Sequence, residues 1–262
     1  MDDYGRNFDL KEEIRSYWSS RAETFDDSPS HHIEDQYGLP AWQDFLCRSF
    51  GLRQGQTLVG KQVLDIPCGT GEISRVLCTL GAEVTGLDFS ETMHSKAKQK
   101  LSDKLWTPLS CDAGNLAGVS ENQFDFAVTR HLAWTLTEPH KAYAEWCRVI
   151  KPGGRLLIVD GNWRQNPSFR LRLRRRIAHF LSPVPDRAAD DISKDQTIRD
   201  RLHYRDGLTQ VQLTSDLLNA GFGIVEKANV SVLYGRGMRA WPLATRLRQS
   251  SEGRFALVCT VS

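Results

Sequence analysis

The sequence has no apolar run that approaches the roughly 18–20 residues needed to cross a bilayer as a helix. Its first residues, MDDYGRNFDLKEEIRSYW, also lack the basic start and the continuous apolar stretch of a signal peptide. The six cysteines form no CxxC pair and no cluster with histidine at metal-binding spacing; they are Cys47, Cys68, Cys78, Cys111, Cys147 and Cys259. These absences argue against a membrane-spanning protein, a disulfide scaffold and a structural zinc site. We therefore expect a cytoplasmic protein without a metal centre.

The net charge is also small. There are 34 Lys and Arg residues against 32 Asp and Glu residues, a formal charge of +2, so the overall charge does not indicate nucleic acid as a partner. A chain of 262 residues with 40% apolar and 25% charged residues can bury a full core, which excludes global disorder. The length predicts one or two domains.

Short apolar runs alternate with helical patterns from residue 61 onward. The runs predict strands at 62–66, 83–87, 105–110, 124–129, 155–160, 222–228 and 254–261. Helices are predicted at 72–80, 90–101, 138–150 and 213–220, the third of them stopped by Pro152-Gly153-Gly154. This order is typical of an α/β protein with right-handed βαβ units and a mostly parallel sheet.

Two segments lie outside this alternation. Residues 1–55 predict two helices, at 9–25 and 40–50, joined by a polar loop. Residues 161–207 interrupt the alternation and include an arginine-rich helix, Arg170 to Arg176, followed by a polar stretch at 183–195. The apolar residues of that helix fall on one stripe that can pack against the fold: Phe169, Leu173, Ile177 and Phe180. The last two strands are joined by a long loop, so they can be antiparallel.

The chemistry-bearing pattern begins at Asp65, where the first strand enters the glycine loop DIPCGTG and then a helix. Glycines allow a sharp turn and a close approach to a ligand, and a helix N-terminus offers free N–H groups. Asp88 then ends the second strand, where a carboxylate can accept hydrogen bonds from both ribose hydroxyls of a nucleoside. The combination predicts a nucleoside cofactor. A dinucleotide fingerprint is disfavoured because Ser74 stands where its third glycine belongs, and no P-loop lysine follows the turn.

The motifs VLDIPCGTG, GLDFS, CDAGNL, FDFAVTRHLAWTL and KPGGRLLIVD, from about Val63 to Asp160, resemble those of class I S-adenosylmethionine-dependent methyltransferases. LNAGF near residue 220 and YWSSRAETFD near the N-terminus resemble small-molecule methyltransferases of that superfamily. The resemblance implies a Rossmann-like, doubly wound sheet of seven strands with an antiparallel last strand. It also implies S-adenosyl-L-methionine as the cofactor. We expect residues 1–55 to form a helical lid, residues 56–262 the methyltransferase domain, and residues 161–207 an inserted cap.

The same resemblance implies a role for each matching position. Asp65, Gly69 and Gly71 would bind the methionine part of the cofactor, and Asp88 its ribose. The adenine would lie near Phe89 and Met93, with Asp112 accepting from its amino group and the Ala113 N–H reaching a ring nitrogen. The backbone near Arg130 would close the methionine end. Pro67 departs from the pattern, because it stands where the family has a glycine and lacks an N–H.

Methyl transfer needs a base only when the acceptor must lose a proton. His131 follows the fourth strand, at the edge where the sheet meets its ligands, and is our candidate catalytic residue. It can instead bond a loop carbonyl or the cofactor. Trp134 and Trp163 follow the fourth and fifth strands and can stack on a flat acceptor or pack in the core.

The sequence favours a methyltransferase that acts on a small molecule by in-line transfer. The alternative is an enzyme that methylates RNA or another nucleic acid and uses the basic helix Arg170–Arg176 to bind phosphates. The segment TRHLAW argues against it, because it lacks the Asn/Asp-Pro-Pro-aromatic motif of amino-directed nucleic-acid enzymes and the Pro-Cys of cytosine C5 enzymes. A protein that binds the cofactor without catalysis is a third reading. The acceptor and the oligomeric state are not fixed by the sequence.

Overall fold

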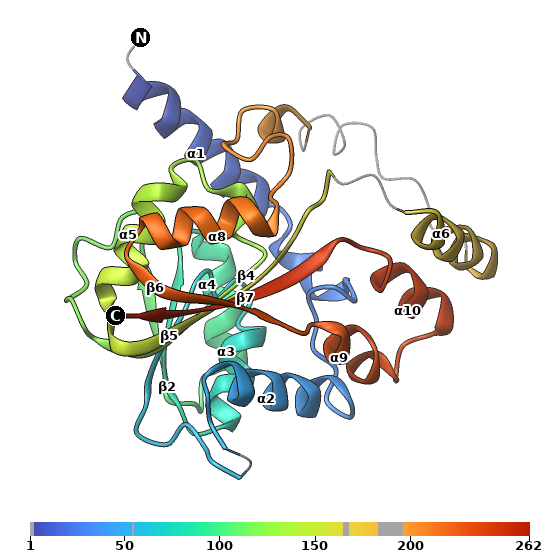
Figure 1. Ribbon diagram of the computed structural model, residues 1–262, viewed down its shortest axis with the longest axis horizontal. Coiled ribbons are helices and arrows are strands. Elements are labelled where there is room, and N and C mark those ends of the chain that lie inside the picture. The colour runs from blue at the N-terminus through green and yellow to red at the C-terminus, as the bar shows by residue number, and fades with distance from the viewer. Residues whose placement is uncertain (1–2, 54, 165–167, 183–195) are drawn as a thin grey trace.

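Seven strands form a sheet in the order β3-β2-β1-β4-β5-β7-β6 (Figure 1). The computed structural model describes residues 3–53, 55–164, 168–182 and 196–262. The strands are β1 (Gln62–Asp65), β2 (Glu83–Asp88), β3 (Trp106–Ser110), β4 (Phe124–Arg130), β5 (Ile150–Gly161), β6 (Phe222–Ala228) and β7 (Arg254–Val261). β1 to β5 pair in parallel, and β7 runs antiparallel to both β5 and β6. The predicted fold class is confirmed.

The helices follow the predicted order, with corrections at some ends. They are α1 (Asp3–Ser19), α2 (Gly38–Ser49), α3 (Glu72–Thr79), α4 (Glu91–Lys100), α5 (Pro139–Val149), α6 (Phe169–Leu181), α8 (Gln210–Asn219), α9 (Ser231–Tyr234) and α10 (Leu243–Gln249). The predicted long loop between β6 and β7 contains α9 and α10, which is a correction. The glycines after α5 lie inside β5, because that strand begins at Ile150 directly after the helix. None of the described helices is long and apolar enough to cross a membrane.

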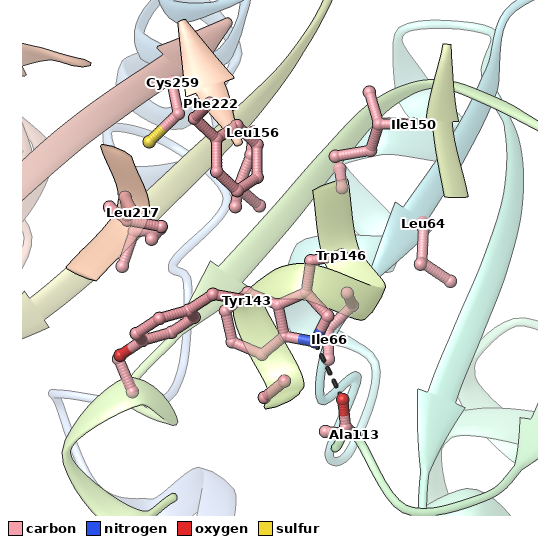
Figure 2. Close-up of a cluster of buried hydrophobic side chains, with 14 of the residues drawn as sticks. Leu64, Ile66, Ala113, Tyr143, Trp146, Ile150, Leu156, Leu217, Phe222 and Cys259 are labelled. Carbon is pink, nitrogen blue, oxygen red and sulfur yellow. Dashed lines mark hydrogen bonds between the residues drawn. The ribbon is translucent and has the colours of Figure 1, made fainter. Parts of the chain in front are cut away.

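Alternate residues of the strands face two separate apolar layers, as a sheet covered on both faces requires. Leu64 of β1 and Leu156 of β5 belong to the layer that includes α5 and α8. Their neighbours Val63 and Leu157 belong to the layer that includes α2 and α3. Figure 2 shows part of the first layer, where the Trp146 indole N–H donates to the Ala113 carbonyl at 2.8 Å.

The arginine-rich helix α6 contradicts the prediction that its apolar stripe is buried. It lies beside α10 at the periphery of the molecule (Figure 1). Its buried residue is Ala178, and Arg175 donates to the hydroxyl and the carbonyl of Ser251. The predicted stripe faces outward, with Phe169 and Phe180 73% and 87% exposed and Leu173 and Ile177 also exposed. Periodicity located the stripe correctly, but it carries no information about which face the rest of the chain covers. The predicted polar stretch at 183–195 lies outside the described residues.

The strand order determines where a ligand can bind. β1 lies between β2 and β4, so the connections from β1 and β4 leave the sheet in opposite directions at the carboxyl ends of these strands. This reversal opens a crevice at that edge, which is where open α/β sheets bind ligands. The glycine loop after β1 and residue His131 after β4 both lie there.

We predict that Trp146→Phe lowers the free energy of unfolding by about 2–4 kcal/mol, because it removes part of a fully buried ring and the indole donor to the Ala113 carbonyl. Chemical denaturation followed by circular dichroism measures the change. Val211→Ala on α8 is the control, since Val211 is 79% exposed and its loss should stay within about 0.5 kcal/mol. Equal midpoints for Trp146→Phe and wild type would refute this account of the core.

Candidate active site

The glycine loop after β1 places its backbone against open space. Gly69 and Gly71 have φ angles of +52° and +86°, a region that residues with a side chain rarely adopt. A Cβ on Gly71 would lie 3.0 Å from a Leu101 methyl group, so this glycine allows α3 and α4 to pack closely. A Cβ on Gly69 would meet only the Phe25 ring, at 3.9 Å. The loop therefore offers bare backbone to a ligand at Gly69.

Asp88, at the end of β2, ties this loop to the start of α4. Its carboxylate accepts hydrogen bonds from the Gly69 N–H at 2.9 Å and from the Ser90 N–H at 2.8 Å. Burial raises the pKa of Asp88, and the backbone N–H donors oppose that rise. The carboxylate that is predicted to bind the ribose lies beside the loop. In this structure it also fixes the loop through the Gly69 N–H.

Asp65, the last residue of β1, is fully buried behind the loop. One carboxylate oxygen accepts from the Ser74 hydroxyl at 2.6 Å, and the other has no partner among the described residues. Burial raises the pKa of Asp65 to about 7.

Asp112, after β3, contacts a residue that sequence reasoning missed. Its carboxylate accepts from the Lys11 ammonium of α1 at 2.6 Å and from the Gly114 N–H at 2.9 Å. Lys11 also donates to Glu138 at 3.2 Å. Because Lys11 is about a hundred residues away from its partners in sequence and belongs to no motif, the sequence gives no signal for this contact.

Arg130 and His131 occupy the end of β4. The Arg130 guanidinium donates to the carbonyls of Ser30 and His31 and lies over the Trp42 ring at 5.1 Å. His131 has a φ of +62°, which is uncommon for a residue with a side chain, and its Nε2 is buried without a partner among the described residues. Burial, with Arg130 and Arg254 nearby, lowers the pKa of His131 well below its usual 6.5. The imidazole is therefore neutral at physiological pH.

Trp134 and Trp163, the aromatic residues predicted near the acceptor, line one small pocket together but have different neighbours. The Trp163 ring meets the His131 ring edge-on at 5.6 Å between centroids. The Trp134 ring lies under the Arg199 guanidinium at 4.4 Å and packs with the core. Trp163 is therefore next to the candidate catalytic residue, whereas Trp134 contributes to packing.

These elements surround a cavity. Seven of the nine predicted cofactor residues line it, as does His131; the seven are Gly69, Asp88, Phe89, Met93, Asp112, Ala113 and Arg130. Asp65 and Gly71 are not among the lining residues. The N-terminal segment supplies another wall, with Lys11, Ile14, Trp18, Phe25 and His31.

Comparison with known proteins gives the same class. The methyltransferase domain family model matches residues 64–158. A demethylmenaquinone methyltransferase from Clavibacter sepedonicus is 28% identical over 210 residues, which cover 79% of this chain and 84% of that protein. One from Desulfitobacterium hafniense is 35% identical over 138 residues, 47% of this chain, and the chain spans about half of that relative's length, 54%.

Among solved structures, phosphoethanolamine N-methyltransferase 2 of Haemonchus contortus in complex with S-adenosyl-L-methionine aligns with a TM-score of 0.61. The alignment has 16% identity and covers 93% of this chain and 57% of that one. A SAM-dependent methyltransferase from Aquifex aeolicus aligns with a TM-score of 0.56 and 17% identity, over 93% of this chain and 98% of the other.

The fold, the loop motifs and these matches together define a class I S-adenosylmethionine-dependent methyltransferase. Within that class, its sequence is similar to the demethylmenaquinone methyltransferases named above. S-adenosyl-L-methionine is its cofactor.

The residues present fit that cofactor. Gly69 leaves room where a side chain would fill the cavity, Asp88 provides a carboxylate at the end of β2, and the loop leads into the N-terminus of α3. When bound, the cofactor supplies an electrophilic methyl group on a sulfonium. The chain's own contribution is to bind, to orient and to keep water out.

We predict that Asp65→Asn changes the pH dependence of stability. The pKa of Asp65 is about 7 in the folded protein and about 3.9 in an unfolded chain, so between these values the folded state holds a proton that the unfolded state has lost. The contribution of Asp65 to stability therefore falls as pH rises through this window. The free energy of unfolding of Asp65→Asn, relative to that of wild type, should therefore increase by about 2–3 kcal/mol as the pH rises from about 5 to about 8. Denaturant unfolding at the two pH values measures this change.

Asp103→Asn is the control, because Asp103 is exposed at 72% of its side chain. Its difference from wild type should be the same at both pH values. A pH-independent difference for Asp65→Asn would show that the carboxyl is ionised throughout this range.

Proposed function

We propose that the protein transfers a methyl group to a small-molecule acceptor that enters the cavity beside His131. The observation that carries this proposal is the cavity itself, which joins the cofactor motifs to a wall from residues 1–55. Such a wall encloses a small acceptor, whereas a polymer strand needs an open groove. The relatives named as demethylmenaquinone methyltransferases support a small acceptor as well.

In this proposal the predicted cofactor contacts keep their roles. Asp88 holds the ribose, Phe89 and Met93 flank the adenine, and Asp112 with the Ala113 N–H recognises its edge. Asp65 and Gly71 support the methionine end, and Gly69 and the backbone at Arg130 border it. Because both Asp112 oxygens already accept hydrogen bonds, the adenine amino group would share one of them with Lys11 or the Gly114 N–H.

His131 remains the proposed catalytic residue. Its neutral imidazole has an unpartnered Nε2 that can accept a proton or a hydrogen bond from an acceptor hydroxyl or amine. Positioning makes the other contribution, since correct alignment for an in-line displacement can supply roughly 7–11 kcal/mol. His131, with its pKa far below physiological pH, is a weak base, so its main effect is to orient the acceptor and receive the proton as the bond forms.

The domain assignments are also proposals. Residues 1–55 act as a lid, since Ile14, Trp18 and Phe25 line the cavity. Within 161–207, the described residues Ile198 and Leu202 pack on Leu10 and Ile14 of α1, which supports a cap that acts through the lid. Helix α6 is beside α10, and no described α6 residue lines the cavity, so its arginines do not favour the nucleic-acid alternative. We also propose a cytoplasmic location, consistent with six free cysteines.

The direct test supplies S-adenosylmethionine with a labelled methyl group to the protein together with an ultrafiltered metabolite extract or with total RNA. We predict label in the metabolite fraction and none in RNA. Asp88→Ala should abolish the labelling and weaken S-adenosylhomocysteine affinity by at least about tenfold in calorimetry, because each charged hydrogen bond to the ribose is worth about 1.5–3 kcal/mol. Asp103→Ala should match wild type. Label confined to RNA would overturn the small-molecule proposal.

A second prediction concerns His131→Asn. Asparagine tolerates the left-handed φ of this position, so the variant removes the imidazole with little backbone strain. Turnover should fall by about 10²–10⁴-fold, while the calorimetric affinity for S-adenosylhomocysteine stays within a few-fold of wild type. If cofactor affinity falls as far as turnover, His131 serves cofactor binding and not catalysis.

A further inference from the structure

Beyond the cofactor loop, five residues from four parts of the chain form one connected cluster. Arg130 ends β4 and His131 follows it, Trp163 follows β5, Tyr234 ends α9 and Arg254 begins β7. We call this group the Arg130–Arg254 cluster. The Arg254 guanidinium lies 4.3 Å from the Tyr234 ring centre and 5.6 Å from that of Trp163, which in turn meets His131.

The antiparallel direction of β7 brings this cluster to the ligand edge. Arg254 pairs in register with Gly161, the last residue of β5, so the start of β7 lies at the carboxyl end of the parallel strands. Arg130 and His131 also line the cavity that contains Gly69 and Asp88. The cluster therefore meets the cavity through Arg130 and His131, whereas Trp163, Tyr234 and Arg254 are not among the residues that line it.

Five buried polar atoms of this cluster have no hydrogen-bond partner among the described residues. They are Arg130 Nε, His131 Nε2, Trp163 Nε1, Tyr234 Oη and Arg254 Nε. Native proteins leave few buried polar groups unpaired, so several in one cluster need an explanation. The two guanidinium atoms are obligatory donors, and the phenol can donate too. A ligand that satisfies these donors must offer acceptor atoms.

The guanidinium groups of the cluster carry positive charge, which suits a ligand with negatively charged acceptor atoms. Arg130 directs its terminal nitrogens to the main-chain carbonyls of Ser30 and His31, so it has no carboxylate partner in these hydrogen bonds. Arg254 forms an ion pair with Glu252 and also donates to Gln249. Burial and the proximity of Arg254 lower the pKa of Arg130, whereas Tyr234, Glu72 and Asp65 oppose this shift. The cluster thus holds two guanidinium groups, one of which is paired with Glu252.

We propose that the Arg130–Arg254 cluster binds an oxyanion, a carboxylate or a phosphate, carried by the methyl acceptor. The assignment rests on the proposed function and narrows its substrate class to anionic small molecules. Guanidinium donors and a phenol hydroxyl are suited to oxyanion oxygens. The Trp163 ring, between His131 and Arg254, provides a flat apolar surface for the part of the acceptor next to the anion.

The test is calorimetric titration of the protein saturated with S-adenosylhomocysteine, using three matched probes: benzoate, phenyl phosphate and neutral benzamide. We expect saturable binding of at least one of the two anions and binding of benzamide at least about tenfold weaker. The preferred anion identifies carboxylate or phosphate as the recognised group. Equal affinity for the anions and benzamide, or no anion binding, overturns the assignment.

Variants locate the site. Tyr234→Phe removes only the phenol oxygen and should weaken the affinity for the preferred anion a few-fold. Arg254→Lys keeps the charge but loses the Nε donor, and it should weaken this affinity about tenfold. Arg174→Lys, at an exposed position of α6, should match wild type. Unchanged anion affinity in both cluster variants places the anion elsewhere and refutes the proposal. The comparison of probes on the wild-type protein stands even where a variant does not fold.

The same titrations separate this inference from the function on which it rests. Failure of the protein to bind S-adenosylhomocysteine in the first step contradicts the proposed methyltransferase function. Binding of S-adenosylhomocysteine followed by indifference to the anions contradicts the oxyanion assignment alone.

Discussion

The site depends on one buried carboxylate. Asp88 accepts hydrogen bonds from two separate backbone segments, from Gly69 in the loop after β1 and from Ser90 at the start of α4. Removing a carboxylate from water is costly unless donors replace the lost hydration, and here the donors come from the elements that the ligand must touch. The bare backbone at Gly69, the position of α4 and the cavity wall at Met93 all follow from this arrangement.

The half of the site that belongs to the cofactor could be predicted from sequence because its residues follow one another along the chain. Strand, glycine loop, helix, strand and Asp88 form a local pattern whose geometry is dictated by backbone chemistry. The mostly parallel sheet was predicted from the alternation of strands and helices, and the antiparallel last strand was implied by the family resemblance. Seven of the nine predicted cofactor residues line the cavity.

The other half could not be predicted, because it is assembled from distant segments. Lys11 reaches Asp112 from α1, and Arg254 and Tyr234 reach the end of β4 from the last quarter of the chain. Such contacts depend on tertiary packing that periodicity does not encode. The outward stripe of α6 is the clearest example: the spacing of Phe169, Leu173 and Ile177 indicates an amphipathic helix, but which face is covered depends on α10, which the sequence pattern did not reveal.

The direction of β7 also has a practical consequence. Because this strand runs opposite to β5, its first residue lies at the cavity edge of the sheet and Val261 lies at the far edge, paired in register with Phe222 at the start of β6. A fluorescent reporter or an immobilisation linker attached to the Ser262 side chain is consequently held on the side of the sheet away from the cavity. Protein that is immobilised on a surface through this position exposes the cavity edge of its sheet to the solution.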